Sequence, residues 1–350
     1  MTKKEGWRAF VKSKRRERPE TLPLGELKKL SVDALEEYND RRKEYHANFG
    51  VLRTPQLELA HEQLDIIFDT GLRVDSDRVK PSAVLDAPAG VGKTTTINEY
   101  LRKFQRDELK RFGERTDSGH ERIPVCRIGM SAQSGLKPVT AAVLRFYGNA
   151  LADKRSANRA QMHAKVQELM YLSETRFVFV DDIHFVDPGS KDGLAVSNYF
   201  KSWSNDLPVC LIMSGVDLEE RGIYADGTAL DKTHAQNGRR WTPISMEPYT
   251  LKRQQGQRDW RSLIANYERI LVLAEHEQGS LLEHSTYIYD RTGGYLVGIN
   301  DLITRAAALA IRRGTERITR DILDAVPMNF TAHQTFWEDR ASSNIVQDAA

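Results

Sequence analysis

A short loop of small residues that ends in lysine and threonine is the feature that most constrains the fold of this chain. It reads Ala-Pro-Ala-Gly-Val-Gly-Lys-Thr over residues 87–94, directly after the apolar run 83–85 and directly before a stretch with helical spacing. Small residues let backbone N–H groups curl around a phosphate, and the start of the following helix adds the positive end of its dipole. The strand, loop and helix therefore predict a phosphate-binding site in an α/β fold.

Two side chains of this loop carry the expected chemistry. We expect the Lys93 ammonium to reach the β- and γ-phosphates of ATP and the Thr94 hydroxyl to ligate Mg²⁺. Ala87 stands where the usual first glycine would be, and it keeps that position small. An ordinary glycine-rich turn is the alternative. The predicted nucleotide-binding residues are Ala87, Pro88, Ala89, Gly90, Val91, Gly92, Lys93, Thr94 and Thr95.

A second apolar run, residues 177–180, ends in the carboxylates of Asp181 and Asp182. Ligands of open parallel sheets gather at the carboxyl ends of the strands, so Asp181 is predicted to hold the water shell of Mg²⁺ beside Thr94. Asp182 stands where many related ATPases place a glutamate that polarises the attacking water, and its shorter side chain predicts slower hydrolysis. The alternative is that the two aspartates only cap a turn.

The fold class follows from short apolar segments that alternate with helical stretches. Such a pattern predicts a parallel sheet covered by helices on both faces. After about residue 250 the pattern is helical only, which predicts a small C-terminal helical domain. The expected strands are 82–86, 123–129, 177–180, 209–213 and 243–246; the expected helices include 33–46, 55–69, 257–276, 280–290, 300–313 and a last one capped by Thr319.

The charges are concentrated at the N-terminus. The chain carries 51 Lys and Arg against 49 Asp and Glu, a net charge of +2, while residues 1–30 hold ten basic against four acidic residues, a local +6. A basic arm of this kind attracts polyanions, and a solvated, poorly ordered terminus is the alternative. We expect a basic arm over 1–30, a nucleotide-binding domain over 31–250, a helical domain over 251–330 and a tail over 331–350.

Composition excludes several other classes of protein. With 40% hydrophobic and 29% charged residues, the chain is neither wholly disordered nor collagen-like. Its apolar runs are too short to cross a bilayer and its N-terminus lacks the apolar core of a secretory signal, so we expect a cytoplasmic protein. Cys126 and Cys210 each lie in an apolar run and are expected to be reduced core residues.

Three further positions are candidates for the reaction. Ser214 directly follows the expected strand 209–213 and could orient water or the γ-phosphate, although turn chemistry explains a serine there nearly as well. Arg239 and Arg240 are candidates for an arginine finger given to a neighbouring subunit, or else form a surface basic pair. His184 is interpreted as a packing or coupling residue, because no partner spacing indicates a metal.

These motifs together resemble an AAA+ ATPase, and shorter stretches resemble the TniB/TnsC family of transposition ATPases. Those stretches are Leu-Arg-Thr-Pro at 52–55, Asp-Asp-Ile-His at 181–184 and the alanine-rich run 306–314 followed by Glu-Arg-Ile-Thr at 316–319. The similarity covers about residues 35–326. It implies a P-loop AAA+ sheet with a helical lid, in a regulator that hydrolyses ATP.

The resemblance also implies partners. It implies non-specific binding to double-stranded DNA, a homo-oligomeric ring or filament, and a transposase, with a target-selection protein as a further partner; residues 131–137, including Lys137, are candidate DNA contacts. The chain departs from the family pattern at Asp182, and residues 294–297 offer no second-sensor arginine. A nucleotide-gated signalling or defence ATPase and a replication-initiator-like ATPase are the alternatives, the latter disfavoured by the lack of a recognisable helix-turn-helix segment.

Overall fold

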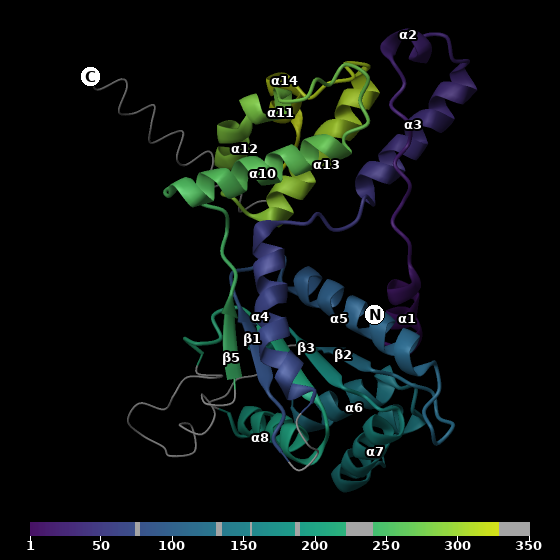
Figure 1. Ribbon diagram of the computed structural model, residues 1–350, viewed down its shortest axis with the longest axis vertical. Coiled ribbons are helices and arrows are strands. Elements are labelled where there is room, and N and C mark those ends of the chain that lie inside the picture. The colour runs from purple at the N-terminus through teal and green to yellow at the C-terminus, as the bar shows by residue number, and fades with distance from the viewer. Residues whose placement is uncertain (74–77, 131–134, 155, 186–189, 222–240, 329–350) are drawn as a thin grey trace. The chain divides into compact units, whose positions relative to one another are not determined.

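The computed structural model describes residues 1–73, 78–130, 135–154, 156–185, 190–221 and 241–328. By contacts, the chain divides into two compact units. The first unit contains residues 1–13, 56–89 and 93–246, and the second contains 14–55, 90–92 and 247–350. This grouping differs from the expected division, because residues 14–55 pack with the C-terminal helices. Figure 1 shows the course of the chain through its elements.

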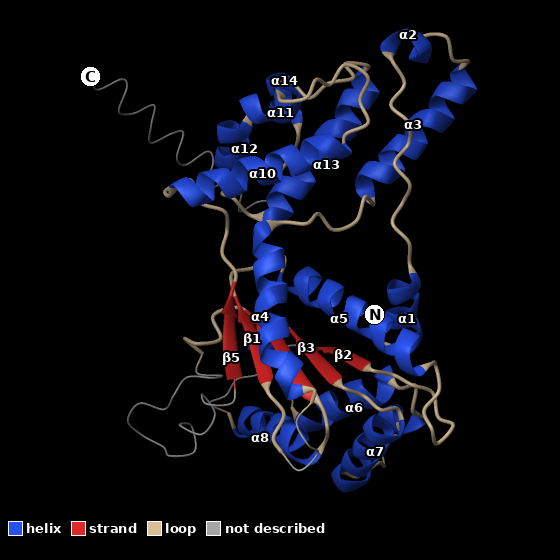
Figure 2. Cartoon of the chain, in the orientation of Figure 1, coloured by secondary structure: helices blue, strands red, loops and turns tan. Residues whose placement is uncertain are grey.

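The first unit is built on a five-stranded parallel sheet with the order β2-β3-β4-β1-β5. The strands are β1 (Ser82–Asp86), β2 (Val125–Gly129), β3 (Phe177–Asp181), β4 (Cys210–Gly215) and β5 (Trp241–Ser245). β3 and β4 are buried along their whole length, as expected for central strands covered on both faces. Helices lie on both faces of the sheet (Figure 2), which confirms the predicted fold class.

The described helices of this unit alternate with the strands from β1 to β4, as the sequence predicts, and two of them precede β1. They are α1 (Lys4–Lys12), α4 (Pro55–Gly71), α5 (Lys93–Phe112), α6 (Leu136–Phe146), α7 (Arg159–Leu172) and α8 (Lys191–Asp206), with short 3₁₀ turns η1 (Ala150–Asp153) and η2 (Ile183–Phe185). The Phe177 ring at the start of β3 meets Phe68 of α4 and Phe104 of α5 edge to face. These aromatic contacts join the helices to the sheet.

The first residues of the chain are part of this unit. Trp7 of α1 is 1% exposed, and its indole N–H donates to the Gln105 side chain on α5 at 2.7 Å. Lys4 and Arg8 of α1 both form ion pairs with Glu121. The alternative of a poorly ordered terminus is therefore wrong for residues 4–12, and part of the N-terminal positive charge is already paired within the protein.

The second unit is helical. Its elements are α2 (Leu24–Leu27), α3 (Val32–Ala47), α10 (Gln254–Ile270), α11 (Ser280–Glu283), α12 (Ser285–Thr292), α13 (Leu296–Arg313) and α14 (Arg320–Ala325). Small alanines at 306, 307 and 310 are fully buried on α13, which packs against α3, α12 and α14. Thr319 caps α14 by accepting the N–H of Ile322, and Gly314 ends α13 in the left-handed conformation, both as the sequence predicts.

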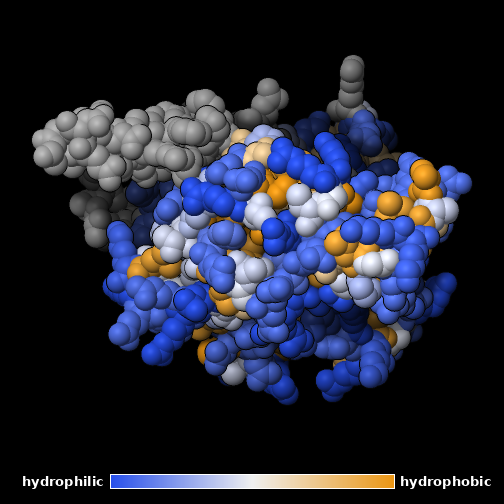
Figure 3. Space-filling view, turned by 90° about the horizontal axis from the view of Figure 1, so that it is seen from above, coloured by the Kyte–Doolittle hydropathy of each residue, from blue (hydrophilic) through white to orange (hydrophobic). Residues whose placement is uncertain are grey.

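Among the described residues, no helix is long and apolar enough to cross a membrane. The face seen in Figure 3 is mainly hydrophilic, and its hydrophobic residues lie in small separate groups.

Cys126 and Cys210 are both free and buried in the sheet, as the sequence predicts.

Candidate functional site

The strand register brings the predicted site residues to one edge of the sheet. Asp86, the last residue of β1, pairs with Gly215 at the end of β4, and Gly129 of β2 pairs with Asp181 at the end of β3. The loop 87–92 leaves the same end of β1, and α5 begins at Lys93. The carboxyl ends of β1, β3 and β4 therefore converge where open α/β sheets bind their ligands.

The loop has the backbone shape that a phosphate cradle needs. Gly90 and Gly92 have φ values of +85° and +96°, a region in which a side chain would be strained. The Lys93 ammonium donates to the carbonyl oxygens of Ala87 at 2.5 Å and Pro88 at 2.8 Å. Ala87 itself is buried, which accounts for a small residue at that position.

Asp181 is the centre of the polar contacts. Its Oδ1 atom accepts hydrogen bonds from the Thr94 hydroxyl at 3.0 Å and from the Ser214 hydroxyl at 2.5 Å. Asp181 and Ser214 are 5% and 1% exposed, so the bond between them is shielded from water, while the bond from Thr94 is partly buried. The structure thus brings together Thr94, Asp181 and Ser214, which the sequence separates widely.

Lys93 lies in an acidic environment. Burial lowers the pKa of its ammonium group below the usual value, and nearby carboxylates raise that pKa and offset part of the effect. The carboxylates are Asp86, Asp182, Asp181 and Asp217. A cationic side chain surrounded by carboxylates at a loop of backbone N–H groups suits a ligand that combines phosphates with a divalent cation.

The oxygen donors fit Mg²⁺. No cluster of three or more His, Cys, Asp or Glu side chains that could hold a metal occurs among the described residues. Mg²⁺ does not need such a cluster, because it keeps several waters and binds through one or two carboxylates together with substrate phosphates. The Thr94 hydroxyl and the Asp181 carboxylate, in contact with each other, are a donor set of that kind.

Asp182 differs from its neighbour in both exposure and backbone. Its side chain is exposed, and its φ of +59° lies in the left-handed region, which aspartate and asparagine enter more readily than most residues. Its carbonyl accepts the N–H of Phe185, so the strand ends in a tight turn. Strained backbone of this kind gathers at functional sites, although a turn alone also requires it.

The remaining candidates lie on α5, η2 and α6 or fall outside the described residues. Thr95 is exposed on the first turn of α5, and His184 is half buried with its ring against Phe185. Arg239 and Arg240 fall outside the described residues, as do positions 131–134 of the candidate DNA-contacting segment. Lys137 is exposed near the start of α6.

Sequence reasoning missed Arg127 and Asn98. The Arg127 guanidinium, on β2, donates from Nη2 to Asp181 Oδ2 at 2.8 Å and from Nε to the side-chain oxygen Oδ1 of Asn98 at 3.1 Å. A charged residue inside the otherwise apolar run Val-Cys-Arg-Ile was the available signal, because a buried strand of a parallel sheet seldom carries an unpaired charge.

Comparisons with known proteins agree with this architecture. Residues 77–223 match the family model described as an AAA domain. The Orc1 protein of Aeropyrum pernix, solved in complex with DNA, superposes with a TM-score of 0.55 at 17% identity, covering 86% of this chain and 69% of that chain. Cdc6p of Pyrobaculum aerophilum gives a TM-score of 0.55 at 17% identity, with 79% and 68% covered.

A third structure, the ORC2 protein of Aeropyrum pernix with ADPNP and ADP, gives a TM-score of 0.54 at 12% identity, covering 78% of this chain and 68% of that chain. No curated protein sequence matches the chain. At these identities the structural likenesses establish the fold and leave the activity to be argued from the site. Residues 77–223 are therefore similar to an AAA domain, and the sheet unit has the P-loop fold shared by the Orc1 and Cdc6p structures.

Proposed function

We propose that this protein is an ATPase that binds Mg-ATP at the loop 87–94 and uses hydrolysis as a switch. One observation carries the proposal: Thr94 of the loop and Asp181 at the end of β3 share a hydrogen bond, so the two halves of a nucleotide site meet. Loop glycines with positive φ and the adjacent Lys93 support the same proposal.

Each side chain has a role in the proposed reaction. Lys93 binds the β- and γ-phosphates, while Thr94 and Asp181 would hold Mg²⁺, which when bound neutralises charge developing on the phosphates. Asp182, exposed at the turn after β3, acts as the general base: its carboxylate accepts a hydrogen bond from the attacking water and takes up the proton that the water loses. Ser214 fixes the Asp181 carboxylate, because its hydroxyl donates a hydrogen bond to Oδ1 of Asp181.

We propose that the protein acts on double-stranded DNA without sequence preference. The fold it shares with the Orc1 protein solved on DNA supports this. Because Lys4 and Arg8 are paired with Glu121, we place the DNA contacts elsewhere, with 131–137 as the first candidate segment. Sequence-tolerant binding to phosphates must weaken steeply as salt rises.

The finer proposal is a regulator of DNA transposition that assembles on target DNA as a ring or filament and recruits or activates a transposase, with residues 251–330 as its lid. The sequence resemblance to the TniB/TnsC family supports it. A replication-initiator-like ATPase is the second candidate, and the likeness in fold to Orc1 and Cdc6p favours it.

One experiment separates these candidates. The protein is imaged by negative stain with duplex DNA of arbitrary sequence and a non-hydrolysable ATP analogue, and its ATPase rate is measured with and without that DNA. Rings or filaments together with stimulated turnover support the transposition regulator. Binding is also measured with a pool of duplexes of random sequence, and selection of one particular sequence from that pool supports the initiator. Nucleotide binding with no response to any DNA would overturn both and favour a signalling ATPase.

A further inference from the structure

The carboxylate of Asp181 has a third partner that the proposed reaction does not use. While Oδ1 accepts from Thr94 and Ser214, Oδ2 accepts from Arg127 Nη2 at 2.8 Å. The side chains of Arg127 and Asp181 are 13% and 7% exposed, so the ion pair is largely shielded from water. The carboxylate predicted to bind a divalent cation is thus already paired with a monovalent one.

The guanidinium is held in this place from three sides. Its Nε donates to the side chain of Asn98, which is 6% exposed on α5, and its carbon lies 5.5 Å from the centre of the Phe179 ring. Arg127 and Phe179 are register partners on neighbouring strands. The ion pair is therefore built from β2, β3 and α5 and does not depend on a surface rotamer.

Two effects of Arg127 on a metal at Asp181 oppose each other. By fixing the carboxylate it could strengthen metal binding, as partners of metal ligands commonly do. By placing a positive charge on Oδ2 it weakens metal binding, because a cation beside it is repelled and the carboxylate is partly neutralised. Two hydroxyl donors already fix Oδ1, so loss of Arg127 would free the carboxylate little and the charge effect should dominate.

We propose that Arg127 is a positioning residue that sets the Mg²⁺ requirement of the nucleotide site by competing for Asp181. Its guanidinium neutralises the buried carboxylate when metal is scarce and holds down the affinity for Mg²⁺. The proposal rests on the proposed function of this site as a Mg-nucleotide site.

The test compares the wild-type protein with Arg127→Met and Arg127→Lys in two assays that do not depend on turnover. In the first, binding of a fluorescent ATP analogue is measured as Mg²⁺ is varied. Arg127→Met should lower the half-saturating Mg²⁺ concentration by about tenfold, the scale on which neighbours of metal ligands change metal affinity. Arg127→Lys keeps the charge but lacks the geometry to bridge Asp181 and Asn98, so its half-saturating Mg²⁺ concentration should lie between those of the wild type and Arg127→Met.

In the second assay, the thermal unfolding midpoint is followed with Mg²⁺ and no nucleotide. Removing the guanidinium leaves a buried carboxylate without its closest positive charge, so Mg²⁺ should raise the midpoint of Arg127→Met more than that of the wild type. Arg145→Met is the matched control, because it breaks an exposed pair with Asp153 and should change neither measurement.

An unchanged or increased Mg²⁺ requirement in Arg127→Met would overturn the proposal. If Arg127→Met does not fold, the same comparison is decided by Arg127→Gln, which also removes the charge and whose half-saturating Mg²⁺ must fall below that of the wild type. A wild-type protein that binds no nucleotide at any Mg²⁺ concentration would instead overturn the proposed function, and the inference about Arg127 with it.

Discussion

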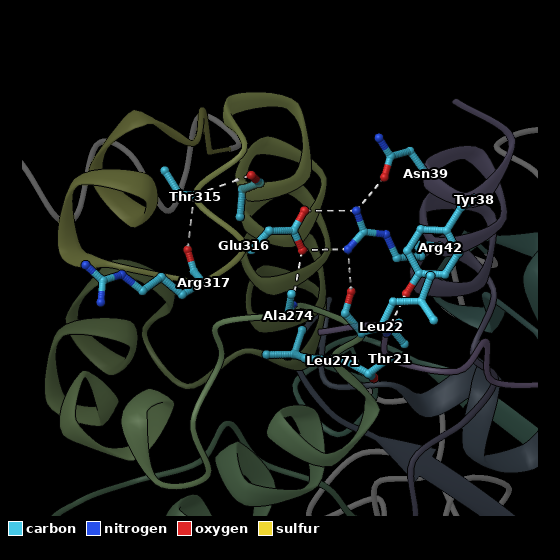
Figure 4. A network of polar contacts seen from close by, with 12 residues as sticks. Thr21, Leu22, Tyr38, Asn39, Arg42, Leu271, Ala274, Thr315, Glu316 and Arg317 are labelled. Atoms are coloured by element: carbon cyan, nitrogen blue, oxygen red, sulfur yellow. Dashed lines mark hydrogen bonds and ion pairs between the residues drawn. The ribbon is translucent and has the colours of Figure 1, made fainter. Parts of the chain in front are cut away.

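Arg42 and Glu316, 274 residues apart in the chain, form a bidentate ion pair inside the helical unit (Figure 4). The two bonds join Nη1 to Oε2 at 2.6 Å and Nη2 to Oε1 at 2.9 Å, and the side chains are 1% and 6% exposed. Arg42 also donates to the Val272 carbonyl and to Asn39, and Glu316 accepts the N–H of Ala274. This network attaches α3 to the C-terminal helices.

Breaking this pair from one side should be costly. Arg42→Met leaves the Glu316 charge buried without its partner, and we expect the free energy of unfolding to fall by about 3–5 kcal/mol. Urea unfolding followed by circular dichroism measures the change. Glu316→Gln removes the charge but keeps an acceptor for the N–H of Ala274. Combining it with Arg42→Met should therefore reduce the free energy of unfolding by less than the sum of the two single variants. Additive losses in the double variant would show that the two residues do not act as a pair.

His46 should make the stability of the protein depend on pH. Burial, followed by the positive charges of Arg42 and Arg18, lowers the pKa of His46 to about 4, and its Nε2 accepts the N–H of Val272 at 2.9 Å. The unfolded chain takes up a proton near its ordinary pKa of about 6.5, so the contribution of His46 is complete above that pH. It is lost as the pH falls from about 6.5 to 4, up to roughly 3 kcal/mol.

The measurement is the urea midpoint at pH 7.5 and pH 5. His46→Gln, which keeps an acceptor and cannot titrate in this range, should show a smaller fall than the wild type. Replacing the exposed His120 by Gln is the control and should leave the fall unchanged. An equal fall in the urea midpoint for the wild type and His46→Gln would rule out His46 as the source of the pH dependence.

Lys93→Ala should weaken ATP binding by roughly 100-fold, because a charge-assisted contact to phosphate is worth about 3 kcal/mol. Isothermal titration with ATP and Mg²⁺ measures it, and circular dichroism should show an intact fold. Lys103→Ala, on the exposed face of the same helix, is the matched control. Unchanged affinity in a folded Lys93→Ala protein would remove the loop from the nucleotide site.

The two adjacent aspartates should fail in different ways. Asp182→Asn should bind Mg-ATP normally and hydrolyse it about 10²–10⁴ times more slowly, the usual contribution of a general base. Asparagine tolerates the positive φ at this position, so the backbone should not change. Asp181→Asn should instead raise the Mg²⁺ concentration needed for ATP binding. Single-turnover hydrolysis and a Mg²⁺ titration separate the two, and wild-type hydrolysis by Asp182→Asn would pass the catalytic role to another group.

We expect Arg240 to act on the site of a neighbouring subunit, with Arg239 as a phosphate or surface contact. A guanidinium supplied from outside can stabilise charge on the γ-phosphate in a way that an isolated subunit cannot. Mixing Arg240→Ala with Lys93→Ala protein should restore ATPase activity, since each supplies the half-site that the other lacks. Full activity of Arg240→Ala alone would exclude this role.

The sequence predicted the sheet well because its strands are short, apolar and bounded by loops. The first strand has the predicted limits, and the others differ by one or two residues at their ends. The helix expected over 257–276 stops at Ile270 instead, because Leu271 turns to extended backbone and Val272 bonds to His46. Helical periodicity cannot show a partner that lies more than two hundred residues away.

The same limit applies to the candidate site. The loop 87–94 and Asp181 could be found because their chemistry is written in adjacent residues, and the structure then brings Thr94 and Asp181 into contact. Arg127 could not be assigned a partner, because its contact with Asp181 depends on the register of β2 against β3. Local sequence fixes which groups are present, whereas the pairing of strands decides which of them meet.

The order in which the chain passes through its two units determines how the protein can be dissected. Residues 1–13 belong to the sheet unit, 14–55 to the helical unit, and the chain then returns to the sheet. A stop codon near residue 250 would therefore not give an independent ATPase fragment. Helix α3 would remain in that fragment, and Arg42 would lose its ion pair with Glu316 and become exposed to solvent. A fragment of the sheet unit would need residues 1–13 joined to 56–246 by a linker, and a fragment of the helical unit would need 14–55 joined to 247–328.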